Sequence, residues 1–316
     1  MHQSLIRLCC LVSLVLLTAC ARSPVLSPEA ERLPERVELS DVPFFPQQAY
    51  QCGPAALATM LTQRDVATTP GALRDKVYLP GREGSLQVEM VAAARSHDML
   101  VYPLQPKLET LLIEVAAGNP VLVLQNLAFD WYPQWHFAVV VGYDRRARTL
   151  TLRSGTTRRL VDDFASFERS WARGQRWAVL TLPPEQLPAQ ADMHRWLAAA
   201  SDLEQTGRVQ AAQRAYRRAS EAWPEQALPW FALGNRRYVA GDQQGAEQAL
   251  RASVEKEPDF AAGWYNLSQL LGERGCAREA RQAQACAQKL APDDTRFAMP
   301  PADRGDGQCQ ALPVCP

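Results

Sequence analysis

Residues 47–56 read QQAYQCGPAA, and this stretch decides how the chain is interpreted. Pro54 suits the first position of a helix, and the residues after it are good helix formers as far as Leu61. The stretch therefore predicts a helix that begins beside Cys52. A thiol at a helix N-terminus lies near the positive end of the helix dipole and near unsatisfied N–H groups, which lower its pKa and favour the thiolate. We interpret Cys52 as a nucleophile rather than as a buried structural cysteine.

A histidine supplies the base that such a nucleophile needs. Residues 136–144 read HFAVVVGYD, which predicts a strand that begins at His136 and is followed by a turn and a returning strand. A base must itself be held by a third group. If the turn centres near Arg146, Ala138 pairs with Ser154, and Ser154 lies on the same face of the sheet as His136.

Together these motifs resemble the bacteriocin-processing double-glycine peptidases, which are papain-like cysteine peptidases of α+β fold. The resemblance spans residues 41–182 and is carried by VPFFPQ at 42–47, CGPAALA at 52–58 and HFAVV at 136–140. It implies a peptide or protein substrate and no cofactor. It also implies that a glutamine before the nucleophile and a backbone N–H at the nucleophile hold the oxyanion. Gln47 fits this place best, and Gln48 is the alternative.

One departure from that family concerns the third catalytic residue. The family usually carries an Asp in an Asp-Pro pair on the strand after the histidine, whereas residues 152–155 here read LRSG, without an acid. Ser154 is our candidate for the third member, through a neutral hydrogen bond. Asn126 is the alternative, because it ends an apolar strand and papain uses an Asn in this role. Without a carboxylate the imidazolium is less stabilised, so we expect slow turnover or none.

The N-terminus predicts a targeting segment. The apolar run at 8–17 is too short to span a membrane, and it ends in LTAC at 17–20, which resembles the lipobox of bacterial lipoprotein signals. The resemblance implies a signal peptide over residues 1–19 and a lipid on Cys20. Several acyl chains together anchor a protein stably to a membrane.

The residues after Cys20 predict where the protein resides. Ala21 resembles the residue found at this place in lipoproteins sorted to the outer membrane, which implies the periplasmic face of that membrane. Residues 20–40 contain several prolines among polar residues and predict a flexible, lipidated tether. The papain-like domain is then expected over residues 41–182.

The C-terminal third repeats with a period of 34 residues. The repeated positions are Trp196, Trp230 and Trp264; Gly207, Gly241 and Gly275; Ala212, Ala246 and Ala280; and Pro224, Pro258 and Pro292. This pattern is the tetratricopeptide signature, in which each unit is a pair of antiparallel helices, with the glycine at the turn and the proline after the second helix. We expect a linker over 183–192 and three repeats over 193–294. Their concave face predicts a protein partner, with a passive spacer or dimerisation module as the alternative.

The remaining cysteines predict disulfides in the C-terminal tail, residues 295–316. Cys276 and Cys286 lie in one predicted helix about 15 Å apart, which is too far for them to bridge each other. In an oxidising periplasm we expect both to pair with Cys309 and Cys315, which staples the tail over the last repeat. The connectivity stays open, and a Cys309–Cys315 bridge is an alternative.

Composition limits the other function classes. The chain has 316 residues with 47% apolar residues and a net charge of zero, so it can bury a core and has no charge excess that favours nucleic acid. It contains no phosphate-binding loop for a nucleotide and no Cys/His spacing typical of zinc. The aromatic residues of 131–135, directly before His136, either line a substrate cleft or pack in the core.

The predicted architecture is an α+β papain-like cysteine peptidase domain followed by an all-α tetratricopeptide solenoid. The expected function is that of a membrane-anchored periplasmic cysteine peptidase that hydrolyses a peptide bond through a Cys–His mechanism. One alternative is a non-catalytic peptide-binding adaptor of an envelope complex. Another is a cell-wall peptide amidase that uses the same nucleophile.

Overall fold

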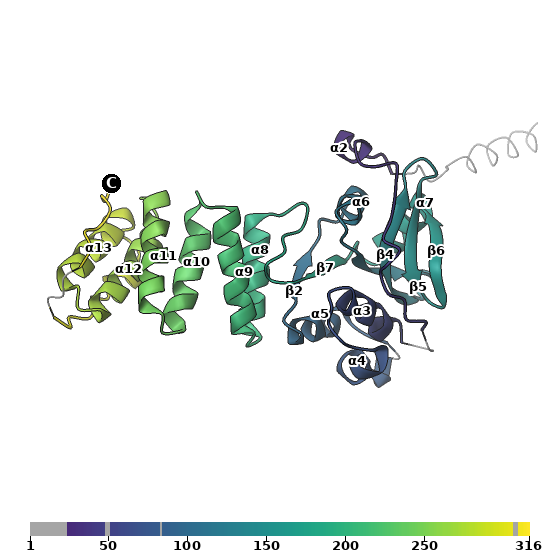
Figure 1. Cartoon of the computed structure of the whole chain (residues 1–316), viewed down its shortest axis with the longest axis horizontal. Coiled ribbons are helices and arrows are strands. Elements are labelled where there is room, and N and C mark those ends of the chain that lie inside the picture. Colours follow the sequence, from purple (N-terminus) through teal and green to yellow (C-terminus); the bar gives the residue numbers. More distant parts are fainter. Residues whose placement is uncertain (1–23, 48–50, 83, 306–308) are drawn as a thin grey trace, which may run out of the picture. The chain divides into compact units, whose positions relative to one another are not determined.

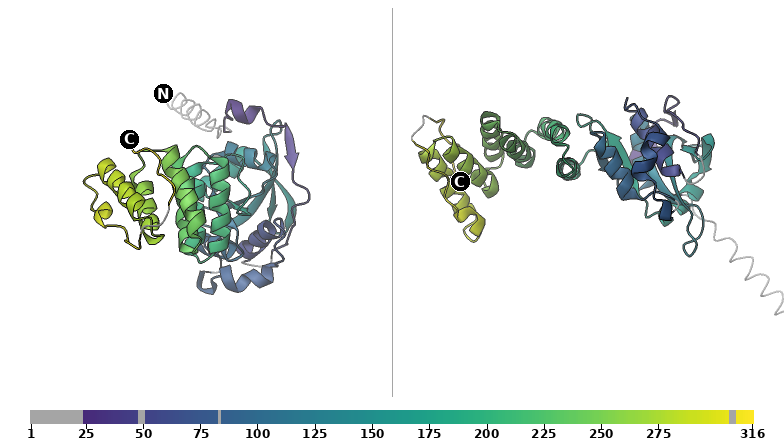
Figure 2. Two further views of the ribbon diagram at one scale, coloured as in Figure 1. Left: turned by 60° about the vertical axis from the view of Figure 1, so that its left-hand side comes forward. Right: turned by 90° about the horizontal axis from the view of Figure 1, so that it is seen from below.

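A computed structural model describes residues 24–47, 51–82, 84–305 and 309–316 (Figures 1 and 2). The signal peptide and Cys20 therefore lie outside the described residues, as does Gln48. The chain forms two compact units. The first contains residues up to 63, 67–85 and 104–179, and the second contains 64–66, 86–103 and 180–316.

A mostly antiparallel arrangement of strands forms the framework of the first unit. The described strands are β1 (Arg36–Glu38), β2 (Leu100–Pro103), β3 (Val121–Asn126), β4 (Trp135–Asp144), β5 (Thr149–Ser154), β6 (Thr157–Asp163) and β7 (Ala178–Leu182). Of these, β2 and residues 180–182 of β7 belong to the second unit. Their order in the sheet is β2-β7-β3-β4-β5-β6, and β1 pairs with β4. β4 is the longest strand, and it pairs antiparallel with β3, β5 and β1.

Helices pack on this framework. They are α2 (Pro28–Glu31), α3 (Cys52–Thr62), α4 (Pro70–Val77), α6 (Leu108–Ala116) and α7 (Phe164–Arg173), with a short 3-10 helix η1 (Pro80–Arg82). α3 begins at Cys52, two residues before the predicted first position at Pro54, and every residue from Gly53 to Leu61 is buried. Its run of alanines allows close packing, and α3 contacts β3, β4 and β5. This central position fixes the start of α3 against the sheet.

The N-terminal segment is folded onto the first unit, so the prediction of a flexible tether is wrong for residues 24–40. β1 pairs with the end of β4. Gly142 permits this close approach, because a Cβ there would lie 2.7 Å from the carbonyl oxygen of Val37. Upstream, Arg148 donates to the carbonyl of Pro24, and Nη2 of Arg145 donates to the carbonyl of Leu33 at 2.6 Å. Prolines in this segment thus accompany a short helix and a docked strand rather than a free chain.

Three helix pairs of the second unit bear out the 34-residue period. They are α8 (Met193–Gln205), α9 (Val209–Ala222), α10 (Ala227–Val239), α11 (Gln243–Lys256), α12 (Ala261–Glu273) and α13 (Ala277–Leu290), which follow one another in a row in Figure 1. Gly207, Gly241 and Gly275 lie at the turns with φ near +80°, which only glycine adopts readily. No described helix is long and apolar enough to cross a membrane.

Tryptophan and proline of the repeat contact each other directly. The indole N–H of Trp230 donates to the carbonyl of Pro224 at 2.9 Å, and that of Trp264 donates to Pro258 at 2.7 Å. The proline ends one helix pair and the tryptophan begins the next, so this bond links successive pairs. The shared spacing of these residues therefore has a structural cause.

The second unit also includes a segment from the middle of the chain. Strand β2 contacts α8, α9 and helix α5 (Gln87–Ser96), and Nη2 of Arg95 in α5 donates to Oδ2 of Asp202 in α8 at 2.6 Å. The hydroxyl of Tyr102 accepts a hydrogen bond from the backbone N–H of Asp192 at 3.0 Å, and its ring lies 6.4 Å from that of Trp196. The compact units therefore divide differently from the predicted boundary at residues 183–192, because pairing and packing recruit residues 86–103 to the repeats.

Two disulfides hold the C-terminal tail on the last repeats. Cys276 pairs with Cys309 and Cys286 with Cys315, so the predicted stapling is confirmed and the alternative Cys309–Cys315 bridge is wrong. The guanidinium of Arg251 donates to two tail carbonyls at 2.9 Å each. The tail therefore covers apolar surface at the end of the stack.

Removal of either disulfide is expected to destabilise the second unit. The bridges close segments with sequence separations of 33 and 29 residues, for which loop entropy predicts about 3–4 kcal/mol each. Urea unfolding followed by circular dichroism should show similar losses for the Cys276→Ser/Cys309→Ser and Cys286→Ser/Cys315→Ser variants. Cys52→Ser is the control. A loss below about 1 kcal/mol for either pair would contradict the stapling role.

Candidate active site

The thiol of Cys52 lies at the first turn of α3 and is partly buried. Burial is the main influence on it and raises the pKa of the thiol. The backbone of Phe137, and those of Gly53 and Cys52 itself, act in the opposite direction without outweighing burial. The expectation of a lowered pKa is therefore wrong, because the helix N-terminus stabilises the thiolate less than water would. Among the described cysteines, Cys52 is the free one.

The imidazole of His136 is held by the expected serine. Its Nε2 lies 2.8 Å from the Oγ of Ser154. The two strands pair with Val139 opposite Arg153, which is the predicted register and places His136 and Ser154 on one face. Nearer the turn the pairing differs from the prediction by one residue, because a bulge between Val140 and Gly142 shifts the register. Burial lowers the pKa of His136. Both the thiol and the imidazole are thus biased towards their neutral forms.

The position of Ser154 determines which nitrogen of His136 can act as a base. With the ring proton on Nε2, the imidazole donates to the Oγ of Ser154 and leaves Nδ1 as an acceptor. Nδ1 is then free of that bond and available for a thiol proton. A neutral serine orients the ring, but it stabilises an imidazolium less than a carboxylate does.

Gln47 is brought to the same region through its backbone. Its N–H donates to the carbonyl of Gly155 at 3.1 Å, directly after Ser154. The thiol of Cys52 is influenced by the backbone of Phe137, directly after His136. The contacts therefore join the four predicted residues pairwise: Gln47 to the hairpin that carries Ser154, Ser154 to His136, and the strand of His136 to Cys52.

Asn126 has a different structural role. Its Oδ1 accepts hydrogen bonds from the backbone N–H groups of Ala128 and Gln134, and its Nδ2 donates to the carbonyl of Phe129. These three bonds close the loop between β3 and β4. The side chain is thus committed to that loop, and the observed partner of His136 is Ser154.

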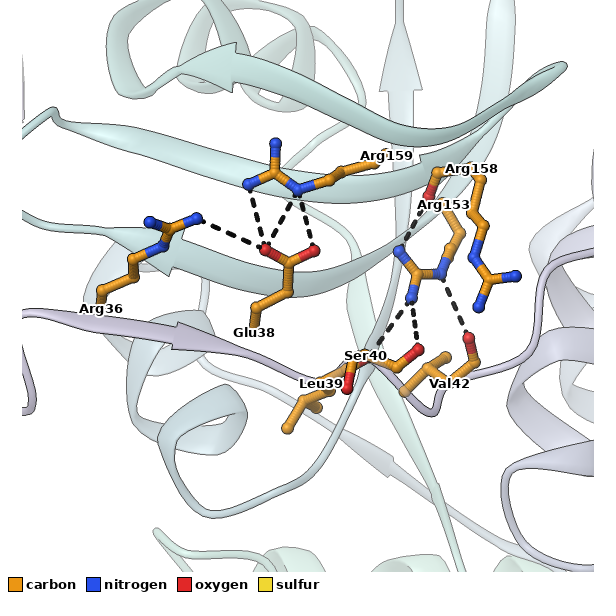
Figure 3. A network of polar contacts seen from close by, with 8 residues as sticks. All are labelled: Arg36, Glu38, Leu39, Ser40, Val42, Arg153, Arg158 and Arg159. Carbon is orange, nitrogen blue, oxygen red and sulfur yellow. Dashed lines mark hydrogen bonds and ion pairs between the residues drawn. The ribbon is translucent and has the colours of Figure 1, made fainter.

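A buried arginine, which the sequence analysis does not single out, positions the segment that leads to Gln47. The guanidinium of Arg153 donates to the carbonyls of Val42 at 3.2 Å, Leu39 at 3.3 Å and Ser40 at 3.2 Å (Figure 3). It also donates to the carbonyl of Arg158 at 2.8 Å, within its own hairpin. The group thus ties residues 39–42 to the hairpin of Ser154. An arginine inside an apolar strand signals a buried partner, but the sequence does not reveal which one.

Gln125 is a second neighbour that the sequence analysis does not select. It pairs directly with His136 across β3 and β4, and its Nε2 donates to the Oγ of Ser170 at 2.7 Å. It is 4% exposed. Its amide fixes the strand beside His136 and connects that strand to α7. Among the described residues no cluster of His, Cys, Asp and Glu is arranged to hold a metal ion.

Comparison with known proteins gives a family match for the region that contains the candidate site. Residues 39–179 match the model of the Peptidase_C39 like family. The matched region is C39-like, and it includes residues 64–66 and 86–103 of the second unit. The resemblance seen in the motifs and the papain-like α+β fold are therefore confirmed, and tandem helix pairs follow this domain. No curated protein matches the chain.

Three solved structures resemble parts of the chain. One, described as a C39-like peptidase from Bacillus anthracis, has 19% identity and a TM-score of 0.40 over 47% of this chain and 98% of that one. A double glycine motif protease from an AMS/PCAT transporter, in complex with the leader peptide, has 20% identity and a TM-score of 0.35 over 45% and 91%. The Yersinia enterocolitica type III secretion chaperone SycD, in complex with a peptide of the translocator YopD, has 16% identity and a TM-score of 0.31 over 34% and 81%.

Arg153→Met should release the segment that precedes Gln47. Four carbonyls lose a charged donor, so the free energy of unfolding should fall by about 2–4 kcal/mol. Hydrogen exchange at the Gln47 amide, which bonds to Gly155, should become faster. Arg159→Met is the matched control, because Arg159 pairs with Glu38 at the surface. Equal effects of the two variants would contradict the positioning role of Arg153.

The pH dependence of Cys52 alkylation should reflect its burial. Only the thiolate reacts, and a raised pKa means less thiolate at any given pH. The rate with iodoacetamide, measured by mass spectrometry of the Cys52 peptide, should therefore rise with a midpoint above the roughly 8.5 of an ordinary cysteine. The urea-unfolded protein is the control and should show the ordinary value. A midpoint below about 7 would instead indicate a preformed thiolate–imidazolium pair.

Proposed function

We propose that the first unit is a cysteine peptidase that hydrolyses a peptide bond through Cys52 and His136. The observation that carries this proposal is the hydrogen bond between His136 and Ser154. The thiol of Cys52 lies beside the backbone of Phe137, the residue that follows His136 in β4. Gln47, fixed beside Gly155, supplies the amide that a papain-like oxyanion site requires.

Catalysis starts from a neutral thiol and a neutral imidazole. The Sγ of Cys52 attacks the carbonyl carbon of the substrate while its proton passes to Nδ1 of His136. The oxyanion receives hydrogen bonds from the backbone N–H of Cys52 and the side-chain amide of Gln47. His136 returns the proton to the leaving amine as the C–N bond breaks, which leaves a thioester. Water, deprotonated by His136, then attacks the thioester and releases the carboxylic acid and the thiol.

The hydroxyl of Ser154 stands where a carboxylate would be more effective. It orients the ring of His136, and with the ring proton on Nε2 it leaves Nδ1 as the base. It contributes no negative charge to balance the imidazolium that forms during attack. Slow turnover follows, and a substrate that excludes water from the site would compensate in part.

We place this activity at the periplasmic face of the outer membrane, with Cys20 as the lipidated residue. The two disulfides support an oxidising compartment, because such bridges do not persist in most cytosolic proteins. The concave face of the helical repeats would bind a protein partner or the substrate.

A second candidate function is that of a peptide-binding adaptor without turnover. The raised pKa of Cys52 and a serine, rather than an acid, as the hydrogen-bond partner of His136 favour it. An amidase that acts on cell-wall peptides would use the same nucleophile and differ only in the substrate. Activity measurements on variants separate these possibilities.

The test is hydrolysis of a quenched-fluorescent peptide library by the full chain and its variants. Cys52→Ala and His136→Ala should abolish turnover, and Gln47→Glu, which keeps the size but loses the amide donor, should lower kcat about 100-fold or more. Ser154→Asp should raise kcat, because a carboxylate stabilises the imidazolium. It should also raise the pKa of His136 and so move the acidic limb of the pH profile to higher pH.

Two results would reject the peptidase function in favour of one of the alternatives. Peptides that bind Cys52→Ala and the parent chain equally, without cleavage by either, would establish the adaptor. Cleavage of muropeptides but not of the library would establish the amidase. Urea unfolding of each variant controls for loss of fold.

A further inference from the structure

Three arginines and two glutamates line one cavity at the turn between β4 and β5. The cavity has a volume of about 670 Å³, and its charged lining consists of Arg145, Arg146, Arg148, Glu31 and Glu35. All five residues belong to the first unit, and none of them takes part in the candidate active site. We call this site the arginine cavity.

Two of the arginines fix the walls of the arginine cavity. The backbone N–H of Arg145 donates to the carbonyl of Glu35 at 2.8 Å, and its Nε donates to the carbonyl of Pro34 at 3.1 Å. The guanidinium of Arg148 donates to the carbonyl of Pro24, which also lines the cavity. The cavity is therefore formed before any ligand binds, and a ligand does not have to order its walls.

The charged side chains of the cavity are not paired with one another. Among the described residues, no ion pair joins Glu31 or Glu35 to an arginine, and the exposed side chain of Arg146 has no polar partner. The Nε of Arg148 is buried and also has no partner within the described part of the chain. Guanidinium groups bind phosphate, and carboxylates bind ammonium groups. The cavity therefore suits a ligand that carries both a phosphate and an ammonium group.

The position of the cavity along the chain indicates where such a ligand comes from. Pro24 lies four residues after Cys20, which is at most about 14 Å of extended chain. Val25, which also lines the cavity, is apolar and 92% exposed. If Cys20 carries the proposed lipid, the tether holds the cavity at the membrane surface, where phospholipid headgroups have a high effective concentration.

A second group of exposed side chains lies at the opposite end of β4. Trp131, Tyr132 and Trp135 are 81%, 71% and 50% exposed, so core packing, one interpretation of the sequence, is wrong for them. Aromatic side chains also suit a membrane interface. However, the ten residues of β4 separate them from the β4–β5 turn by roughly 30 Å. The short tether before Pro24 therefore favours the arginine cavity as the membrane contact.

We propose that the arginine cavity binds the headgroup of phosphatidylethanolamine in the membrane that holds Cys20. This inference rests on the proposed lipid anchor and not on peptidase activity. The phosphate is bound by Arg146 and Arg148, and the ammonium group by Glu31 and Glu35. A choline headgroup fits less well, because its methylated nitrogen has no N–H to donate to a carboxylate. The contact holds the β4–β5 turn at the bilayer and leaves the end of β4 that carries His136 in water.

Arginine footprinting of the mature, lipidated protein in vesicles tests the proposal. Phenylglyoxal modifies accessible guanidinium groups, and mass spectrometry of peptides gives the rate at Arg146 relative to Arg158. Arg158 is an exposed arginine on β6 of the same unit and serves as the internal control. The ratio should be about fivefold lower in vesicles of equal parts phosphatidylethanolamine and phosphatidylcholine than in phosphatidylcholine alone. Such a fall corresponds to a headgroup concentration about four times Kd.

Variants locate the effect on the carboxylates of the cavity. Glu31→Gln/Glu35→Gln should abolish the difference between the two kinds of vesicle, because the ammonium group loses its partners. Asp75→Asn is the matched control, because it removes an exposed carboxylate of α4 outside the cavity and should keep the difference. Equal ratios in both kinds of vesicle, or a difference that persists in the double variant, would overturn the proposal.

Further outcomes separate this proposal from neighbouring ones. Equal protection of Arg146 by soluble glycerophosphoethanolamine without vesicles would indicate a soluble ligand and overturn the lipid assignment. Quenching of tryptophan fluorescence by brominated phosphatidylcholine that Trp131→Phe removes would place the opposite end of β4 in the bilayer, which also overturns the proposal.

The lipid anchor and the peptidase are tested separately. An intact mass without lipid on Cys20 would reject the anchor alone. Vesicles added to that protein would then support the cavity if phosphatidylethanolamine still protects Arg146, and overturn it if it does not. Peptide hydrolysis without protection of Arg146 would overturn the cavity and leave the peptidase function intact.

Discussion

The buried guanidinium of Arg153 is the constraint on which the candidate site depends. A charged group at 5% exposure is tolerated only if its donors are satisfied, and here they bind carbonyls of Leu39, Ser40, Val42 and Arg158. Because the carbonyls of Leu39, Ser40 and Val42 belong to a segment more than 100 residues away in sequence, their position is set by the hairpin. The same hairpin holds His136 through Ser154. One buried charge therefore connects the segment that leads to Gln47 with the hairpin that orients His136.

Sequence reasoning was most successful where local rules control structure. The start of α3 followed to within two residues from Pro54 and the alanines. The predicted register at Ser154 is present, but a bulge between Val140 and Gly142, rather than the turn alone, produces it. The 34-residue period predicted the three helix pairs. The turn within each pair needs a left-handed backbone conformation, which requires a glycine at the same place in every repeat. The link of Cys276 and Cys286 to the tail followed from their separation along one helix, although the connectivity needed the structure.

Features that depend on distant contacts could not be predicted in this way. The carbonyls that satisfy Arg153 carry no side-chain signature, and the docking of residues 24–40 arises from arginines in a turn more than 100 residues later. The sign of the Cys52 pKa shift was missed because dipole and desolvation act in opposite directions, and only the packed structure gives the degree of burial. Asn126 ends its strand as expected, but its side-chain amide forms hydrogen bonds with the backbone of the β3–β4 loop instead of with the imidazole of His136.

The recruitment of residues 86–103 to the second unit affects how the chain is made. Tyr102 bonds to Gln190 and Asp192, which follow it by 88 and 90 residues. This segment therefore cannot complete its contacts until residues 190–192 are also present. The nucleophile is made before this segment and the base after it, so neither unit is a continuous stretch of chain. A protease therefore cannot separate the two units intact with a single cut, and neither unit can be completed before much of the other has been synthesised.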